Sequence, residues 1–245
     1  MTEPVPSPAE APALSLWSRV MGVFTAPRET FVSIVAHPRW LGVLVLTTLV
    51  GAGGMFAFVA TPVGEQALLD EHLRRQESSG QALSPEAEAQ FKQFAPTFKY
   101  VVPGMLLIVL PVFAFALAGL LFGYGAILGG GGTYKQVLAI LCHAGVVTLL
   151  QAIVINPLNY VRQSLETTTN LTAFFPMVSR ESFLGTLFSW AELFWIWQII
   201  LIAIGFSVLY RRRTAPIAWT LLGIYFGIAL VVACYRSFVA GASLT

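Results

Sequence analysis

The sequence predicts an all-α membrane protein: five transmembrane helices preceded by short amphipathic helices in the membrane interface. Of its 245 residues, 56% are hydrophobic and only 11% are charged. A soluble domain carries roughly 25% charged residues, so this chain has too few charges to cover a surface in water. Several apolar runs also exceed the length of about 18 residues that marks a membrane-spanning helix. These two observations define the fold class.

The residues before the first apolar run divide into two parts. Residues 1–14 are rich in proline and poor in large apolar side chains, so we expect a disordered tail. In residues 15–39 apolar side chains recur at three-to-four spacing around Arg19, which predicts two short helices. Their mixture of aromatic residues and arginines suits helices that lie in the membrane surface. The alternative is a cap that packs against the transmembrane helices.

Five apolar segments follow, and prolines, glycines and charges predict where each one ends. The first begins after Pro38 and ends before Pro62, and four consecutive glycines separate the second from the third. Pro111 should kink the second segment. The predicted spans are residues 40–61, 101–128, 134–156, 183–210 and 215–238. Residues 40–239 therefore form one transmembrane domain.

Two polar connections, residues 62–100 and 157–182, separate the spans on one side of the membrane. The sequence Ser84-Pro85-Glu86 predicts the start of a helix within the first connection. On the other side the connections are only a few residues long, and one carries Arg211, Arg212 and Arg213. The positive-inside rule weights such short loops. We therefore expect the three arginines and the N-terminus in the cytoplasm, and the C-terminus outside.

Four polar residues fall inside the predicted spans: Glu192, His143, Gln151 and Gln198. In a continuous helix Glu192 would lie about 28 Å from Arg211, near the outer boundary of a hydrocarbon core about 30 Å thick. Gln151 reaches a similar depth, so we expect its amide to hydrogen-bond the carboxyl group of Glu192. His143 lies deeper. These residues either hold helices together through polar contacts or line a path for ions or protons.

Two G-x-x-x-G patterns occur in the spans, from Gly119 to Gly123 and from Gly223 to Gly227. Small residues one turn apart let two helices approach closely. We expect these glycines to serve packing inside the bundle. The alternative is a face that binds a second copy of the chain, which would make a homo-oligomer.

No pattern in the sequence predicts an enzyme, a cofactor or a metal site. The glycines at 129–132 precede Lys135, but the spacing differs from that of a phosphate-binding loop, which also follows a strand. Cys142 and Cys234 lie in apolar runs and cannot form a disulfide framework. The net charge of +2 is too small to predict nucleic-acid binding. Asn-Leu-Thr at 170–172 matches a glycosylation sequon, a pattern short enough to occur by chance.

Three stretches, taken in their order and spacing, resemble the Yip1 family of membrane proteins. The stretches are Phe24-Thr-Ala-Pro27 with Thr30-Phe31 and His37-Pro38-Arg39-Trp40, then Gly132-Thr-Tyr-Lys-Gln-Val-Leu138, then Glu192-Leu-Phe-Trp-Ile-Trp197 through Ile204-Gly205. The resemblance covers nearly the whole chain past residue 15. Five spans also fit the layout of this family.

The resemblance implies a membrane adaptor that binds other membrane proteins, not an enzyme. Eukaryotic relatives bind small Rab-type GTPases and act in vesicle traffic, and some bacterial relatives accompany ABC-type exporters. The short N-terminal tail resembles the bacterial members, which implies the bacterial inner membrane. The alternative is a small transporter or ion-translocating subunit that uses His143, Glu192 and Gln198, as an accessory to an ABC-type exporter. A third hypothesis is membrane shaping by residues 15–36.

Overall fold

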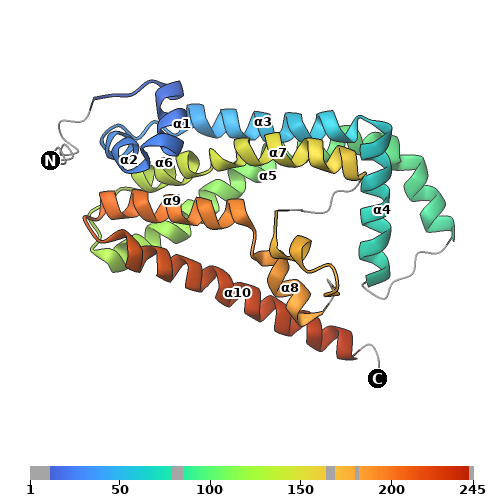
Figure 1. Cartoon of the computed structure of the whole chain (residues 1–245). Helices are drawn as coiled ribbons and strands as arrows, with labels where there is room; N and C mark the ends of the chain where they lie inside the picture. Colours follow the sequence, from blue (N-terminus) through green and yellow to red (C-terminus); the bar gives the residue numbers. More distant parts are fainter. Residues whose placement is uncertain (1–11, 79–84, 164–168, 180–181, 243–245) are drawn as a thin grey trace. The chain divides into compact units, whose positions relative to one another are not determined.

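The computed structural model describes residues 12–78, 85–163, 169–179 and 182–242 (Figure 1). Throughout these residues the backbone forms helices and turns, with one isolated β-bridge and no strand. The elements are α1 (Leu16–Thr25), α2 (Pro27–Ala36), α3 (Leu41–Val59), α4 (Pro62–Ser78), α5 (Pro85–Leu128), α6 (Tyr134–Ala144), α7 (Val147–Arg162), the 3-10 turn η1 (Leu171–Phe174), α8 (Phe183–Trp190), α9 (Leu193–Leu209) and α10 (Thr214–Ala242). Most of the expected disordered tail, and the expected cap Ser84, lie outside the described residues.

Four segments of the described chain are long and apolar enough to cross a membrane: Leu41–Val59, Thr97–Leu128, Tyr134–Arg162 and Thr214–Phe238. They coincide with four of the five predicted spans, so the all-helical, multi-span class is confirmed. The fifth predicted span, residues 183–210, is not one helix. The chain leaves the helix at Ala191 and Glu192, which separates α8 from a 17-residue apolar α9. By length and composition, the described helices therefore support four spans and do not confirm the fifth.

Two other spans differ in extent from the sequence expectation. The helix of the second span begins before it, because α5 runs from Pro85 to Leu128 and continues through Pro111, where the expected kink stays a prediction. The third span turns at Gly145 between α6 and α7, where the amide of Val146 donates to the carbonyl of His143 at 3.1 Å. It then continues through Pro157 to Arg162, six residues beyond the expected end. The expected end lies where the apolar run stops. Polar residues at a membrane surface can continue a helix beyond that run.

The chain divides into two compact units. Unit 1 comprises Met1–Leu49, Ile108–Leu150 and Phe194–Gly223, and unit 2 comprises Val50–Leu107, Gln151–Leu193 and Ile224–Thr245. Helices α3, α5, α7 and α10 contribute residues to both, as does α9 through its first residue, Leu193.

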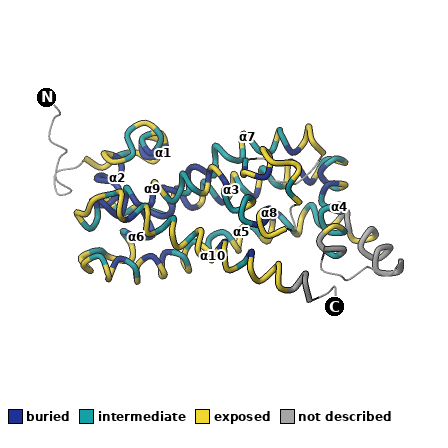
Figure 2. Tube along the Cα trace, turned by 60° about the horizontal axis from the view of Figure 1, so that its bottom comes forward, coloured by how far each residue is buried: buried dark blue, intermediate teal, exposed yellow. Residues whose placement is uncertain are grey.

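The core of unit 1 forms where α1 and α2 pack on α6. Helix α2 is buried from Thr30 through Val35, and its exposed charged residues, Arg28 and Glu29, lie in its first turn. This burial favours the cap over the interfacial helix expected for residues 15–39 (Figure 2). Helix α1 buries one side and exposes Trp17 and Met21. The largest fully buried side chains of the unit 1 core are Phe31, Ile34, Leu138, Ile140, Leu201 and Phe206.

Helix α9 joins this core at Gly205, where side chains from α2 and α6 fill the space a Cβ atom would need. A Cβ atom at Gly205 would collide with Ile140 and would lie 3.2 Å from Phe31. Glycine is therefore required for this close approach. The start of α6 is fixed by a reciprocal cap between Thr133 and Gln136, and the Gln136 amide also donates to the carbonyl of Val35 at 3.0 Å.

Helices α5 and α10 carry the most open apolar surface. In their most apolar stretches only 11% and 17% of residues are buried, against 50% in Tyr134–Arg162. Water cannot cover so much apolar surface at a tolerable free energy, so lipid or other membrane proteins must cover it.

Candidate functional site

The most unusual polar group of unit 1 is Arg19, which lies on α1 with only 6% of its surface exposed. Its Nη1 donates to the carbonyl of Arg39 at 2.9 Å, and its Nε reaches the carbonyl of Ser15 at 3.4 Å. Burial, and then the charge of Arg39, lower the pKa of the Arg19 guanidinium. Within the described residues its partners are carbonyl groups and an imidazole. A buried cation without a carboxylate is costly unless its donors are satisfied.

The imidazole belongs to His143 of α6, which is fully buried. Its Nδ1 lies 2.7 Å from the carbonyl of Ala139, and its Nε2 lies 3.4 Å from Nη1 of Arg19. A carbonyl only accepts and a guanidinium only donates. Nδ1 therefore carries the proton and Nε2 accepts, which defines a neutral ring in one tautomer. In this arrangement His143 ties α6 to α1.

Gln198, the second polar residue predicted for the membrane interior of unit 1, lies beside the turn that follows α6. A Cβ atom at Gly145 would be 3.7 Å from its Nε2. Gly145 follows His143 by two residues, so Gln198 of α9 lies close to the turn that ends the helix of His143.

In unit 2, Glu192 is buried, with 4% of its surface exposed. It forms an antiparallel bridge with Asn170. The amide of Leu171 donates to the carbonyl of Ala191 at 3.1 Å, and the amide of Leu193 donates to the carbonyl of Thr169 at 3.2 Å. These two bonds fasten the chain before η1 to the break between α8 and α9.

The carboxyl group of Glu192 accepts a hydrogen bond from the Thr169 hydroxyl at 2.5 Å. Thr169 is therefore a partner of Glu192 that the sequence did not indicate, and the expected bond from Gln151 stays a prediction. The expectation placed Glu192 on a continuous helix, but the residue lies in an extended bridge, so the helical rise no longer predicts where its side chain reaches.

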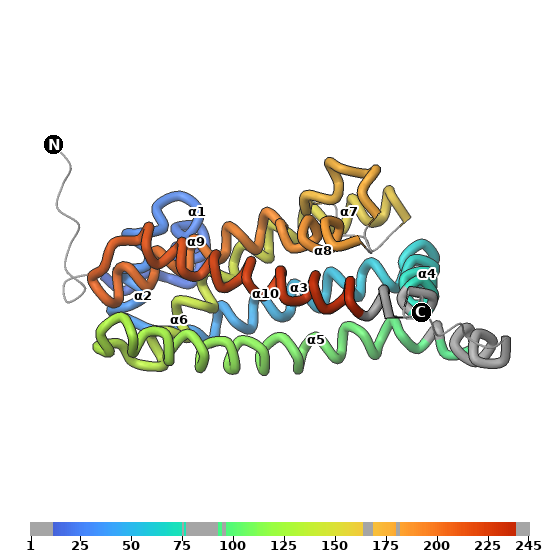
Figure 3. Tube along the Cα trace, turned by 90° about the horizontal axis from the view of Figure 1, so that it is seen from below, coloured from blue at the N-terminus to red at the C-terminus, as the bar shows by residue number. Residues whose placement is uncertain are grey.

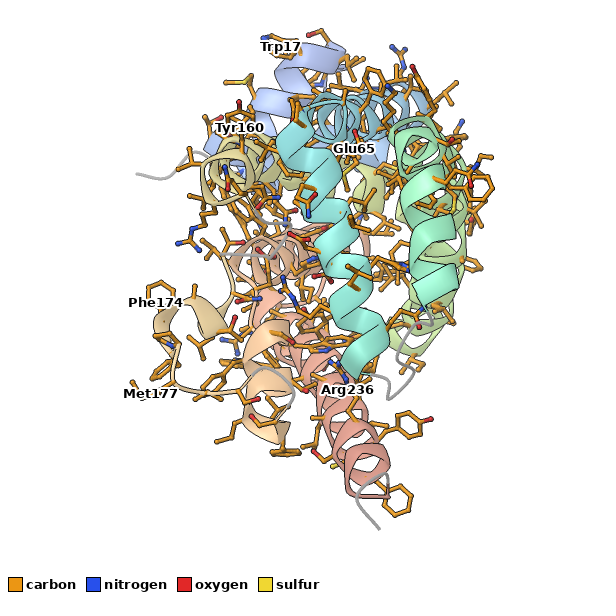
Figure 4. All side chains as sticks on the ribbon, turned by 90° about the vertical axis from the view of Figure 1, so that its right-hand side faces the viewer. Trp17, Glu65, Tyr160, Phe174, Met177 and Arg236 are labelled. Atoms are coloured by element: carbon orange, nitrogen blue, oxygen red, sulfur yellow. The ribbon has the colours of Figure 1, made fainter. Side chains whose placement is uncertain are left out.

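The residues of the glycosylation sequon, 170–172, lie in the loop that pairs with Glu192. The Thr172 hydroxyl donates to Oδ1 of Asn170 at 2.5 Å, and both side chains are buried. Asn170 is therefore a structural residue. Phe174 and Met177 project from the same loop and are among its most exposed side chains (Figure 4).

The four glycines of the G-x-x-x-G patterns do not pack inside the described chain. Gly119, Gly123, Gly223 and Gly227 have no side chain or neighbouring element within 4 Å of the place a Cβ atom would occupy. The structure thus shows no close neighbour at these four glycines, and both expectations, packing inside the bundle and a face for a second copy, stay predictions. Close approach instead occurs at glycines outside the patterns, because no sequence pattern says which face of a helix meets a neighbour.

The three arginines lie exposed in the turn between α9 and α10. Arg211 has a φ of 53°, in the left-handed region that favours glycine. Nε of Arg212 donates to the carbonyl of Leu128 at 3.3 Å, which links this turn to the end of α5 (Figure 3).

Sequence reasoning missed Arg19 and Thr169. Arg19 precedes the apolar Val20 and lies four residues before Val23, so it lies on the buried side of α1. This spacing could have indicated that Arg19 is buried. Thr169 had no such signal, because its role depends on a bridge between distant segments. Among the described residues, no group of three or more His, Cys, Asp or Glu side chains could hold a metal ion.

These features define a multi-span helical membrane protein whose buried polar groups fasten one element to another. The family model of the Yip1 domain matches residues 21–235, nearly the whole chain. The chain belongs to the Yip1 family, as its sequence stretches indicated. No curated protein and no solved structure matches it.

Proposed function

We propose that this protein is an integral membrane adaptor of the Yip1 type, which binds other membrane proteins and catalyses no reaction. The observation that carries the proposal is an open stripe of small residues on α5. Ala116, Gly119, Gly123 and Ala126 recur at three-to-four spacing and are all exposed. A second helix could approach closely along this stripe, as small residues allow in membranes.

The polar groups support the same conclusion. In a transporter, a buried ionisable residue would be expected to face a water-filled path. Here His143 has a partner at each nitrogen, and Glu192 holds a loop through Thr169. The hydrogen bonds of both residues hold parts of the chain together, a structural role that requires no ion transport.

Within this proposal the protein crosses the inner membrane five times, with α9 as the fourth span and the N-terminus in the cytoplasm. Cysteine labelling tests this topology. In a variant with Cys142 and Cys234 replaced by alanine, Arg213→Cys should react only from the cytoplasmic side and Ser179→Cys only from outside. Labelling of both positions from one side would refute it.

Partner binding is tested by co-purification from native membranes after photocrosslinking. We expect the wild-type chain to carry a membrane protein, either an exporter subunit or a second copy, and Gly119→Leu with Gly123→Leu to lose it. Gly104→Leu is the matched control, because Gly104 is equally open on the same helix but lacks a second glycine one turn away. Recovery of the wild-type chain as a partnerless monomer would count against the adaptor.

The second candidate function, a transporter or ion-translocating subunit, is favoured by the burial of two ionisable side chains, Arg19 and His143, in one cluster. Flux into proteoliposomes decides between the two. If the protein moves ions, Glu192→Gln or His143→Ala should change the flux. An unchanged flux in both variants removes this candidate.

A further inference from the structure

A pocket of about 400 Å³ opens in unit 1 between the end of α5 and the start of α10. It is lined by two arginines, Arg212 and Arg213, by the hydroxyl-bearing residues Tyr124 and Thr220, and by apolar residues that include Leu128 and Pro216. The pocket therefore offers cationic, hydrogen-bonding and apolar groups within one small volume.

The backbone holds Arg212 in place at this pocket. Its amide donates to the carbonyl of Ser207 at 3.1 Å, and its Nε donates to the carbonyl of Leu128 at 3.3 Å. The hydroxyl of Thr214 also bonds that of Ser207 at 2.9 Å, which fastens the start of α10 to the end of α9. These bonds use the Nε of Arg212 and leave its two terminal nitrogens available to a ligand.

The charge around the pocket is unbalanced. The segments of unit 1 that build it, residues 108–150 and 194–223, contain four basic residues and no aspartate or glutamate. Arg212 and Arg213 have no ion-pair partner among the described residues. An anion that enters the pocket thus meets uncompensated positive charge.

The chemistry of the lining identifies the anion. The planar guanidinium group binds phosphate oxygens through paired hydrogen bonds. The apolar lining leads to exposed apolar side chains, with Ile127 83% exposed in the lining and Trp219 74% exposed on α10. A tryptophan at the end of a span is typical of the headgroup level of a membrane. A free phosphate would leave these apolar surfaces unused, whereas a phospholipid would cover them.

We propose that this pocket binds the phosphate group of an anionic phospholipid, with Arg212 and Arg213 as the phosphate ligands. Basic pockets between transmembrane helices hold anionic headgroups in this way. The site goes beyond the proposed adaptor role and does not depend on it.

Native mass spectrometry of the full chain in detergent tests the proposal, with phosphatidylglycerol, phosphatidylcholine and soluble glycerol 3-phosphate as probes. We expect phosphatidylglycerol to bind in preference to the other two. Arg212→Gln with Arg213→Gln should weaken this binding at least about tenfold, because each arginine contributes charge-assisted hydrogen bonds. Thr220→Trp, which keeps both arginines and fills the pocket, should weaken it similarly.

The control is Arg28→Gln with Arg236→Gln, which removes the same charge from exposed positions that do not line the pocket. Binding by this variant should match the wild type. Equal binding of phosphatidylglycerol by all variants would overturn the proposal, because attraction would then be general. Equal binding of phosphatidylcholine would overturn the charge argument. Tight binding of glycerol 3-phosphate would identify a soluble phosphate as the ligand and also overturn the lipid assignment.

Discussion

The guanidinium group of Arg19 and the imidazole ring of His143 meet at 3.4 Å, although the two residues are 124 positions apart in the chain. The contact joins α1 to α6, so a residue before the first span is anchored to the interior of the bundle. The contribution of each side chain to the free energy of unfolding therefore depends on the other.

This dependence predicts non-additive effects. His143→Leu should lower the free energy of unfolding by about 2 kcal/mol, because a buried guanidinium loses an acceptor. Adding Arg19→Met removes the stranded charge and should restore part of that loss. Unfolding of the single and double variants in mixed micelles measures the coupling. If the double variant loses as much as the two single variants together, the contact contributes nothing.

The bond between Thr169 and Glu192 predicts local loosening. Thr169→Val removes the hydroxyl donor and should cost about 1–2 kcal/mol, with faster hydrogen exchange at the amides of Leu171 and Leu193. Glu192→Gln should change exchange less, because the amide oxygen can still accept from Thr169. Exchange at those two amides that is the same in Thr169→Val and in the wild type would contradict this assignment.

Two glycines should respond to alanine in opposite ways. Gly205→Ala places a methyl group against Ile140 and Phe31, and we expect a loss of about 1–3 kcal/mol from overpacking. Gly223→Ala enters open space on α10 and should be neutral, or should stabilise by about 0.5–1 kcal/mol through helix propensity. Thermal unfolding in one detergent compares them. Equal melting temperatures would mean that α9 does not pack closely at Gly205.

Arg211 has a left-handed backbone where glycine fits better. Arg211→Gly should therefore raise the free energy of unfolding by up to about 1 kcal/mol. Arg213→Gly removes the same charge from a residue with ordinary backbone angles, and it should destabilise the turn. A melting temperature lowered equally by both variants would show that charge, and not backbone conformation, decides.

Spans could be predicted from the sequence because the membrane imposes one rule: every backbone polar group in lipid needs a partner inside the protein. Long apolar runs such as 41–59 and 214–238 must therefore be helical. The same rule sets no limit outside the lipid, so it could not predict that α7 continues past residue 156 to Arg162. A helix remains favourable past the edge of the apolar core, where hydropathy no longer reports it.

The candidate site was less predictable, because its geometry depends on contacts between distant segments. The break at Glu192 coincides with its pairing to Asn170, which no local pattern indicates. The G-x-x-x-G patterns named glycines able to pack but could not say that Gly119 and Gly123 face outward. His143 was found as a buried polar residue, while its partner Arg19 was taken for part of a surface helix.

The break that ends α8 also fixes the length of α9. Its 17 residues give a helix of about 26 Å, shorter than a hydrocarbon core of about 30 Å. Such a hydrophobic mismatch costs a fraction of a kcal/mol per ångström and is relieved when the bilayer thins. In the five-span topology, the lipid beside α9 would be compressed. The protein would then accumulate where the membrane is already thin.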